Sequence, residues 1–299
     1  MWLALAFVSA FLLGCYDICK KKSVDGNAVI PVLFLNIVFC VLLLLPLFLV
    51  SRFAPDLLDG TMFYIPTVSL EAHGYIIIKS AIVLSSWLFG YFAVKHLPLT
   101  ISGPISSTRP VLVLIGALLI FGEQLNLYQW IGVILTIISF FLLSLSGKKE
   151  GIRFHKDKWI LFAVLAAILG ATSGLYDKYL MQRISPTAVQ FWFNLYQCVM
   201  MLIVMRLLWY PRRKKTTSFN WKWSIILVAV FLTAADFVYF YALTESDAMI
   251  SIVSMVRRSR VLVSFFGGVL FFHVKNLKGT AVDLALIFIA MFFLYLGTK

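Results

Sequence analysis

The chain has 299 residues, of which 62% are hydrophobic and only 13% are charged. Because soluble domains carry about 25% charged residues, this composition excludes a soluble globular protein. The formal net charge of +13 would suit nucleic acid. In so apolar a chain, however, topology signals and contact with anionic lipid explain that charge better, and we expect no nucleic-acid partner.

Ten apolar segments follow one another along the chain, each about 20 residues long, as membrane-spanning helices are. In chain order they are Trp2–Cys19, Ala28–Val50, Gly74–Val94, Leu99–Phe121, Asn126–Ser146, Trp159–Leu180, Thr187–Tyr210, Trp221–Leu243, Ala248–Phe272 and Leu277–Leu296. They take up most of the sequence and leave no room for a soluble domain. The sequence therefore predicts an all-α membrane protein with ten transmembrane helices.

The second half of the sequence repeats the first. Gly-Cys-Tyr-Asp at 14–17 recurs as Gly-Leu-Tyr-Asp at 174–177, and Val111–Val113 recurs as Val261–Val263. We assign residues 1–147 to one repeat, 148–158 to a basic linker and 159–299 to the second repeat. Since each repeat has five segments, an odd number, the two must be inverted relative to each other. Such five-plus-five inverted repeats place a site between the halves and allow alternating access to it.

The fourth segment ends in Phe121-Gly122-Glu123 before a glycine-containing fifth segment. With the ten segments and the inverted duplication, the whole chain resembles the EamA-type members of the drug/metabolite transporter superfamily. This resemblance implies a basket of ten helices, with the third, fourth, eighth and ninth around a central cavity. It also implies transport of metabolites or amino-acid-like compounds, often outward. One departure is that His273 stands at the second-half counterpart of Glu123.

Lysine and arginine gather in the loops that follow odd-numbered segments. These loops hold Lys20–Lys22, the linker 148–158 and Arg212–Lys215, whereas the opposite side holds Arg52, Arg183, Lys299 and Lys178. By the positive-inside rule, the first set of loops is cytoplasmic. We therefore predict a multi-pass protein of the inner (cytoplasmic) membrane with both termini outside, although many family members are drawn with cytoplasmic termini.

Four arginines fall near the middle of predicted membrane segments: Arg109 in the fourth, and Arg257, Arg258 and Arg260 in the ninth. At the centre of a bilayer each arginine costs about 2.5–3.5 kcal/mol on insertion scales. These side chains must therefore face partner helices, water or a ligand. Because they recur at comparable depth in both repeats, we predict a binding site between them.

Asp236 in the eighth segment is the main acidic residue inside a segment, so the arginines keep a surplus of positive charge. A carboxylate or phosphate of a substrate would neutralise it, since the planar guanidinium binds both well. The alternative is a structural ion-pair network of the arginines with Asp236, with Glu245 or Asp247, and with backbone carbonyls.

Other residues are weaker candidates for the site. Trp87, Tyr91 and Tyr239 would line the cavity, although interface belts and core packing also account for aromatic residues in membranes. Asp17 and Asp177 are candidate coupling residues, or they pair with the neighbouring Lys20 and Lys178. Lys79 either snorkels to the interface or lines the cavity, and Glu123 is a coupling or structural residue.

The sequence contains no Walker loop, serine elbow or metal-ligand spacing, so we expect no enzyme, no metal and no cofactor. Any transport would then be secondary. The leading hypothesis is a secondary transporter, working as an exporter, for a small anionic or zwitterionic metabolite. The alternative is a flippase for a phosphate-containing lipid-linked intermediate. The expected partners are the small-molecule substrate and the lipid bilayer, with the chain a monomer or a homodimer.

Overall fold

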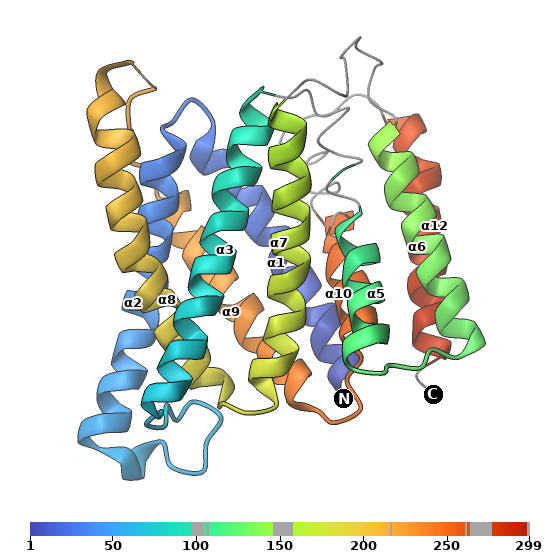
Figure 1. Cartoon of the computed structure of the whole chain (residues 1–299), viewed down its shortest axis with the longest axis horizontal. Helices are drawn as coiled ribbons and strands as arrows, with labels where there is room; N and C mark the ends of the chain where they lie inside the picture. The colour runs from blue at the N-terminus through green and yellow to red at the C-terminus, as the bar shows by residue number, and fades with distance from the viewer. Residues whose placement is uncertain are drawn as a thin grey trace.

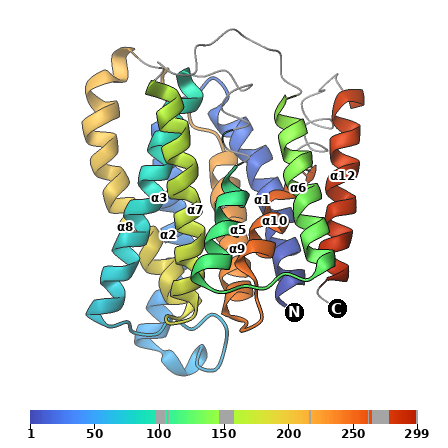
Figure 2. The same cartoon turned by 45° about the vertical axis from the view of Figure 1, so that its right-hand side comes forward.

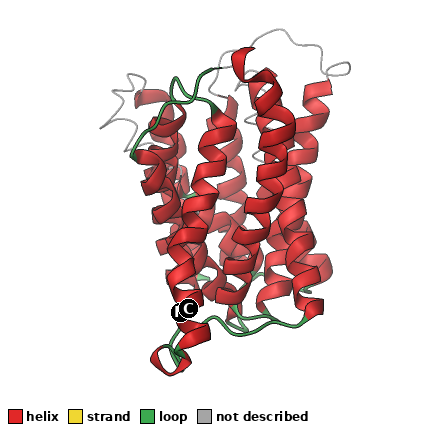
Figure 3. Cartoon of the chain, turned by 90° about the vertical axis from the view of Figure 1, so that its left-hand side faces the viewer, coloured by secondary structure: helices red, strands yellow, loops and turns green. Residues whose placement is uncertain are grey.

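The computed structural model describes residues 1–96, 105, 108–145, 158–215, 217–260, 262–263 and 277–297. Within these ranges the chain forms helices, turns and loops but no strand. The helices stand side by side as an upright bundle, and the two termini lie at the same end of it (Figures 1 and 3).

The described helices follow the predicted segments, although two of them cover only part of the fourth and ninth segments. They are α1 (Trp2–Val24), α2 (Val29–Phe53), α3 (Leu70–His96), α5 (Arg109–Ile120), α6 (Leu127–Leu145), α7 (Lys158–Met181), α8 (Pro186–Val204), α9 (Ser224–Thr244), α10 (Ile250–Arg258) and α12 (Leu277–Leu296). Short helical turns are η1 (Pro55–Leu57), η2 (Met205–Trp209) and η3 (Tyr210–Lys215). Six helices of the described part, α1, α2, α3, α7, α8 and α9, are long and apolar enough to cross a membrane. Together with the shorter apolar helices, they make this a multi-pass membrane protein.

Two helices, α5 and α10, are shorter than a bilayer is thick. Their 12 and 9 residues rise about 18 and 14 Å, against a hydrocarbon core of about 30 Å. Both occupy the lower part of the bundle in Figure 1. Arg109 begins α5 and Arg258 ends α10, so both arginines lie inside the bundle rather than at its faces. The remainder of the predicted fourth and ninth segments is largely outside the described residues.

Helices from the two halves of the chain pack against each other. The closest pairs are α1 with α9, α3 with α7, and α6 with α12, the last pair standing at one side of the bundle (Figure 2). In addition, α2 contacts α8 and α9, and α8 contacts α3. Helices α5 and α10 contact each other, and α5 also contacts α7 while α10 contacts α1. The largest buried apolar cluster lies among these helices and includes Ile76, Val113, Tyr239 and Val256. The core therefore surrounds the inner ends of α5 and α10.

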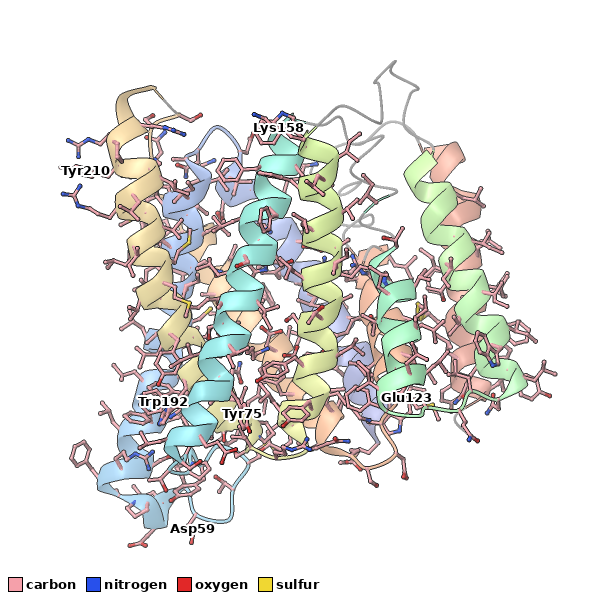
Figure 4. The ribbon with its side chains drawn as sticks, viewed as in Figure 1. Asp59, Tyr75, Glu123, Lys158, Trp192 and Tyr210 are labelled. Atoms are coloured by element: carbon pink, nitrogen blue, oxygen red, sulfur yellow. The ribbon has the colours of Figure 1, made fainter. Side chains whose placement is uncertain are left out.

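The two ends of the bundle differ in charge. Asp59 and Glu123 lie at the end where the termini lie, and Lys158 and Tyr210 lie at the opposite end (Figure 4). We call these the acidic end and the basic end. The acidic end also has Asp56, Glu71, Glu245 and Asp247, and the basic end has Lys20–Lys22, Arg212, Arg213 and Lys222. Basic residues thus gather at one end of the bundle.

Candidate functional site

The packing of α5 against α10 brings the arginines of the two halves together. Arg109, Arg258 and Arg260 lie close enough for their positive charges to repel one another. Like charges assemble in a bundle interior only when something else compensates them. The surroundings of each arginine therefore decide what the site does.

Two of the arginines have carboxylate partners. Nη2 of Arg257 donates a 2.9 Å hydrogen bond to Oδ1 of Asp236 on α9, and its guanidinium carbon lies 3.7 Å from the ring centroid of Tyr239. Nε of Arg260 lies 3.3 Å from Oδ2 of Asp17 on α1. The predicted network with Asp236 is thus present, but it accounts for only part of the charge.

The other two arginines form no ion pair within the described part of the chain. Nη2 of Arg109 donates a long hydrogen bond of 3.4 Å to the Ser86 hydroxyl on α3, and its Nε is buried without a hydrogen-bond partner. Its guanidinium lies directly against Gly170 of α7. Arg258 forms neither a hydrogen bond nor an ion pair with the same residues, and the Asp17 carboxylate, which is paired with Arg260, acts on it only at longer range. Two guanidinium groups thus lie inside the bundle without an ion pair to the described residues.

Lys79 is a buried cation with its own counter-ion. It is only 2% exposed, forms an ion pair with Asp177 of α7, and its Nζ lies 4.5 Å and 5.0 Å from the ring centroids of Phe193 and Phe240. The Tyr239 hydroxyl donates to Oδ2 of Asp177 at 3.3 Å. The prediction that Lys79 snorkels to the interface is therefore wrong, because a carboxylate meets it within the bundle.

The predicted pairing of Asp177 with its neighbour Lys178 is also wrong. Adjacent residues on a helix point about 100° apart, so they cannot easily share one partner. Lys178 instead donates to the backbone carbonyl of Ala248, in the loop that precedes α10. The repeat-related Asp17 pairs with Arg260.

A family comparison identifies the chain. The family model described as "EamA-like transporter family" matches residues 1–145 and 157–296. The chain belongs to the EamA-like transporter family. The resemblance to EamA-type members of the drug/metabolite transporter superfamily, predicted from the segments and the repeat, is confirmed.

Two further relatives agree with this membership. The EamA chain is 26% identical over 223 residues to an "Uncharacterized transporter" of Archaeoglobus fulgidus, which covers 71% of this chain and 76% of the relative. A solved structure described as "Crystal structure of protein" superposes with a TM-score of 0.72 at 15% identity, over 99% of this chain and 97% of the other. The solved structure shows that the fold is shared, and the family and relative names indicate a transporter.

Glu123 has a structural position in this EamA fold. Gly122 adopts a positive φ of 62°, which glycine allows without strain, and turns the chain at the end of α5. The Glu123 carboxylate then accepts hydrogen bonds from the Ile250 backbone N–H at 2.6 Å and the Ser251 N–H at 3.2 Å, as well as from the Ser251 hydroxyl. It therefore caps the N-terminus of α10, the helix that carries Arg257 and Arg258.

The aromatic candidates of the EamA chain separate in space. Tyr239 lies between the two charged groups, since its ring faces Arg257 and its hydroxyl binds Asp177. Trp87 packs against a cluster of Ile37, Leu84 and Met201 and not against the arginines. The Tyr91 side chain is outside the described part. Ser86 and Gly170 contact Arg109 but were not predicted as site residues, because neither residue type marks a site by itself.

Proposed function

We propose that this EamA-family protein is a secondary transporter that exports a small anionic or zwitterionic metabolite. Its binding groups are Arg109 and Arg258, at the meeting point of α5 and α10. The observation that carries the proposal is the charge balance of the interior. Among the described residues around α5 and α10, five cations (Lys79, Arg109, Arg257, Arg258 and Arg260) face three carboxylates (Asp17, Asp177 and Asp236), which leaves two positive charges without an ion pair. The buried Lys178 is a further cation, which donates to a backbone carbonyl.

A substrate anion supplies the missing charge most directly. Leaving a buried guanidinium unpaired is costly, and a carboxylate or phosphate that accepts its hydrogen bonds removes that cost. The N-terminus of α5, which begins at Arg109, adds the partial positive charge of its helix dipole. Arg257, paired with Asp236 and in contact with Tyr239, supports the site from the side.

We further infer that residues 1–147 and 159–299 form a five-plus-five inverted repeat joined by the linker 148–158. The most extensive helix contacts support this, because they are reproduced when the halves are exchanged. The α1–α9 contact corresponds to α7–α3, α2–α9 to α8–α3, and α10–α1 to α5–α7. At the residue level, Gly14 faces Val263 as Gly174 faces Val113. The family matches over residues 1–145 and 157–296 divide the chain at the same place.

Two ion pairs between the halves support alternating access. Asp17 lies near the end of α1 at the basic end, and its repeat equivalent Asp177 lies near the end of α7 at the acidic end. The side chains of Lys79 and Asp177 are 2% and 9% exposed, whereas those of Arg260 and Asp17 are 30% and 29% exposed. We infer a conformation closed toward the acidic end and looser toward the basic end.

The same proposal places the basic end in the cytoplasm and the termini outside, in the inner membrane. A reporter that works only in the cytoplasm, fused to Lys299, is expected to be inactive, and strong activity would reverse this orientation. In this orientation the looser end faces the cytoplasm, from which an exporter takes up its substrate. The protein would act with substrate and lipid as partners, as a monomer or a homodimer.

Thermal unfolding of the purified protein with a panel of carboxylates and organic phosphates tests the function. A bound ligand raises the apparent stability by mass action, and Arg109→Gln and Arg258→Gln are expected to abolish that rise. Arg183→Gln, at an exposed arginine of the acidic end, is the matched control and should bind as wild type. Unchanged ligand response in both site variants would overturn the proposal. Movement of a lipid-linked phosphate across vesicles, with no uptake of the soluble anions, would instead favour the flippase.

A further inference from the structure

Gly170 on α7 occupies a position where any larger side chain would displace the Arg109 guanidinium. A Cβ atom built there would fall on the Nη2, Cζ and Nε atoms of Arg109. Gly170 is buried in the middle of a regular helix and does not have a positive φ. In such a place glycine is less favourable than alanine by about 1 kcal/mol. The backbone gives no reason for glycine, whereas the arginine beside it does.

The internal repeat contains a natural comparison for this contact. By the spacings of the repeat, Ala10 corresponds to Gly170 and Ser259 corresponds to Arg109. Both counterparts are buried, and the Ser259 hydroxyl donates to the carbonyl of Val256 at 2.7 Å. The half that has a short serine in place of the arginine therefore has an ordinary side chain in place of the glycine.

The next small residue along α7 behaves differently. Gly174 has its own counterpart, Gly14, which is also glycine, and a Cβ at 174 would make an ordinary 3.8 Å contact with Val113. Of these two glycines on α7, Gly174 therefore serves general helix packing, whereas Gly170 is specific to Arg109.

Ser86 fixes the guanidinium from the other side. Its hydroxyl donates to the Ala166 carbonyl at 2.9 Å, one turn before Gly170 on α7, and accepts from Nη2 of Arg109 at 3.4 Å. The Nε atom of Arg109 is left buried and without a partner. Helices α3 and α7 therefore enclose the Nε–Nη2 edge of the guanidinium, and Nη1, which forms no hydrogen bond with the described residues, is left for an oxyanion.

We propose that Gly170 is a positioning residue of the transport site. It provides the space in which the Nε–Nη2 edge of the Arg109 guanidinium lies, and so orients the remaining nitrogen, Nη1, toward a bound carboxylate or phosphate. This inference rests on the proposed function, because it assumes that Arg109 binds the anion. A methyl group at position 170 would push the guanidinium away from Ser86 and change its spacing from Arg258.

The test uses inorganic phosphate as the probe, titrated into the purified full-length protein by calorimetry. Gly170→Ala is expected to raise the Kd about tenfold, as the loss of one charge-assisted hydrogen bond would. Gly174→Ala is the matched control, since it adds the same methyl group one turn away without a clash, and should leave the Kd within about twofold of wild type. Arg109→Lys should weaken binding when introduced alone, but should not weaken it further when combined with Gly170→Ala.

The outcomes separate the two proposals. If Arg109→Gln abolishes phosphate binding while Gly170→Ala binds as wild type, Gly170 is no positioning residue but the anion site stands. If Arg109→Gln also binds as wild type, the proposed site itself falls. If Gly170→Ala does not fold, Gly170→Ala combined with Arg109→Ala removes the clash and is expected to restore folding. A double variant that also stays unfolded would overturn the role of Gly170.

Discussion

Lys79 and Arg109 both come from the first half of the chain, and both lie against α7. Lys79 contacts Asp177, and Arg109 contacts Gly170, seven residues earlier on that helix. Beside Lys79, α7 carries the Asp177 carboxylate, which forms an ion pair with Lys79 and also accepts a hydrogen bond from the Tyr239 hydroxyl. Beside Arg109, α7 has only the backbone of Gly170, and the Nε atom of Arg109 has no hydrogen-bond partner. The same helix thus neutralises one cation and only makes room for the other. A charge that the protein compensates holds helices together, whereas one that it leaves open is available to a ligand.

Removing the Asp177 carboxylate, which neutralises Lys79, should have the largest effect on stability. Asp177→Asn leaves the Lys79 ammonium buried and unpaired, and is expected to lower the free energy of unfolding by about 3–5 kcal/mol. Thermal unfolding in detergent measures the loss. Lys79→Met combined with Asp177→Leu removes both charges and should recover most of it. A loss below about 1 kcal/mol in Asp177→Asn would show that the ion pair does not hold α3 to α7.

Neutralising an open arginine should have the opposite effect on stability. Arg258→Gln removes a charge that repels Arg109 and Arg260, so the free energy of unfolding should stay constant or rise by about 1 kcal/mol. At the same time the stabilisation by added anions should disappear. A clear loss of stability with anion binding intact would mean that Arg258 belongs to a structural network.

Removing the cap of α10 should lower both the stability of the bundle and its affinity for anions by a moderate amount. Glu123→Ala frees the N–H groups of Ile250 and Ser251, and is expected to cost about 1 kcal/mol of stability. Because α10 positions Arg257 and Arg258, anion affinity should fall as well. Asp247→Asn, at an exposed carboxylate of the same loop, should change neither quantity. Equal behaviour of the two variants in both assays would rule out the capping role.

The smallest effect is expected at Tyr239, which contacts both the Asp177 carboxylate and the Arg257 guanidinium. Tyr239→Phe removes the 3.3 Å hydrogen bond to Asp177 and keeps the ring beside Arg257. The free energy of unfolding should fall by about 1 kcal/mol, the net value of one hydrogen bond, while phosphate affinity should be unchanged. A large drop in affinity would show that the hydroxyl itself contacts the substrate.

Much of the architecture could be predicted from the sequence. Continuous apolar runs located most of the helices, because in lipid every backbone group must be satisfied within a helix. Helices α5 and α10, however, cover only parts of the fourth and ninth predicted segments. The cost of charge in a membrane likewise marked Arg109 and Arg258 as unusual before any contact was known. Even so, α1 continues to Val24, well past the predicted Cys19, since the lysines at its end remain helical.

The sequence by itself determined the class, the family and the presence of excess positive charge inside the bundle. Only the tertiary structure decided which cations are neutralised. Lys79 and Asp177 lie 98 residues apart in the chain, and Glu123 lies 127 residues before the N–H that it caps at Ile250. Segment periodicity is local and says which residues lie at membrane depth, but pairing depends on which helices become neighbours. For that reason the sequence left Lys79 as a residue that either snorkels or lines the cavity and did not predict Gly170 as a site residue, whereas the structure shows α7 beside both α3 and α5.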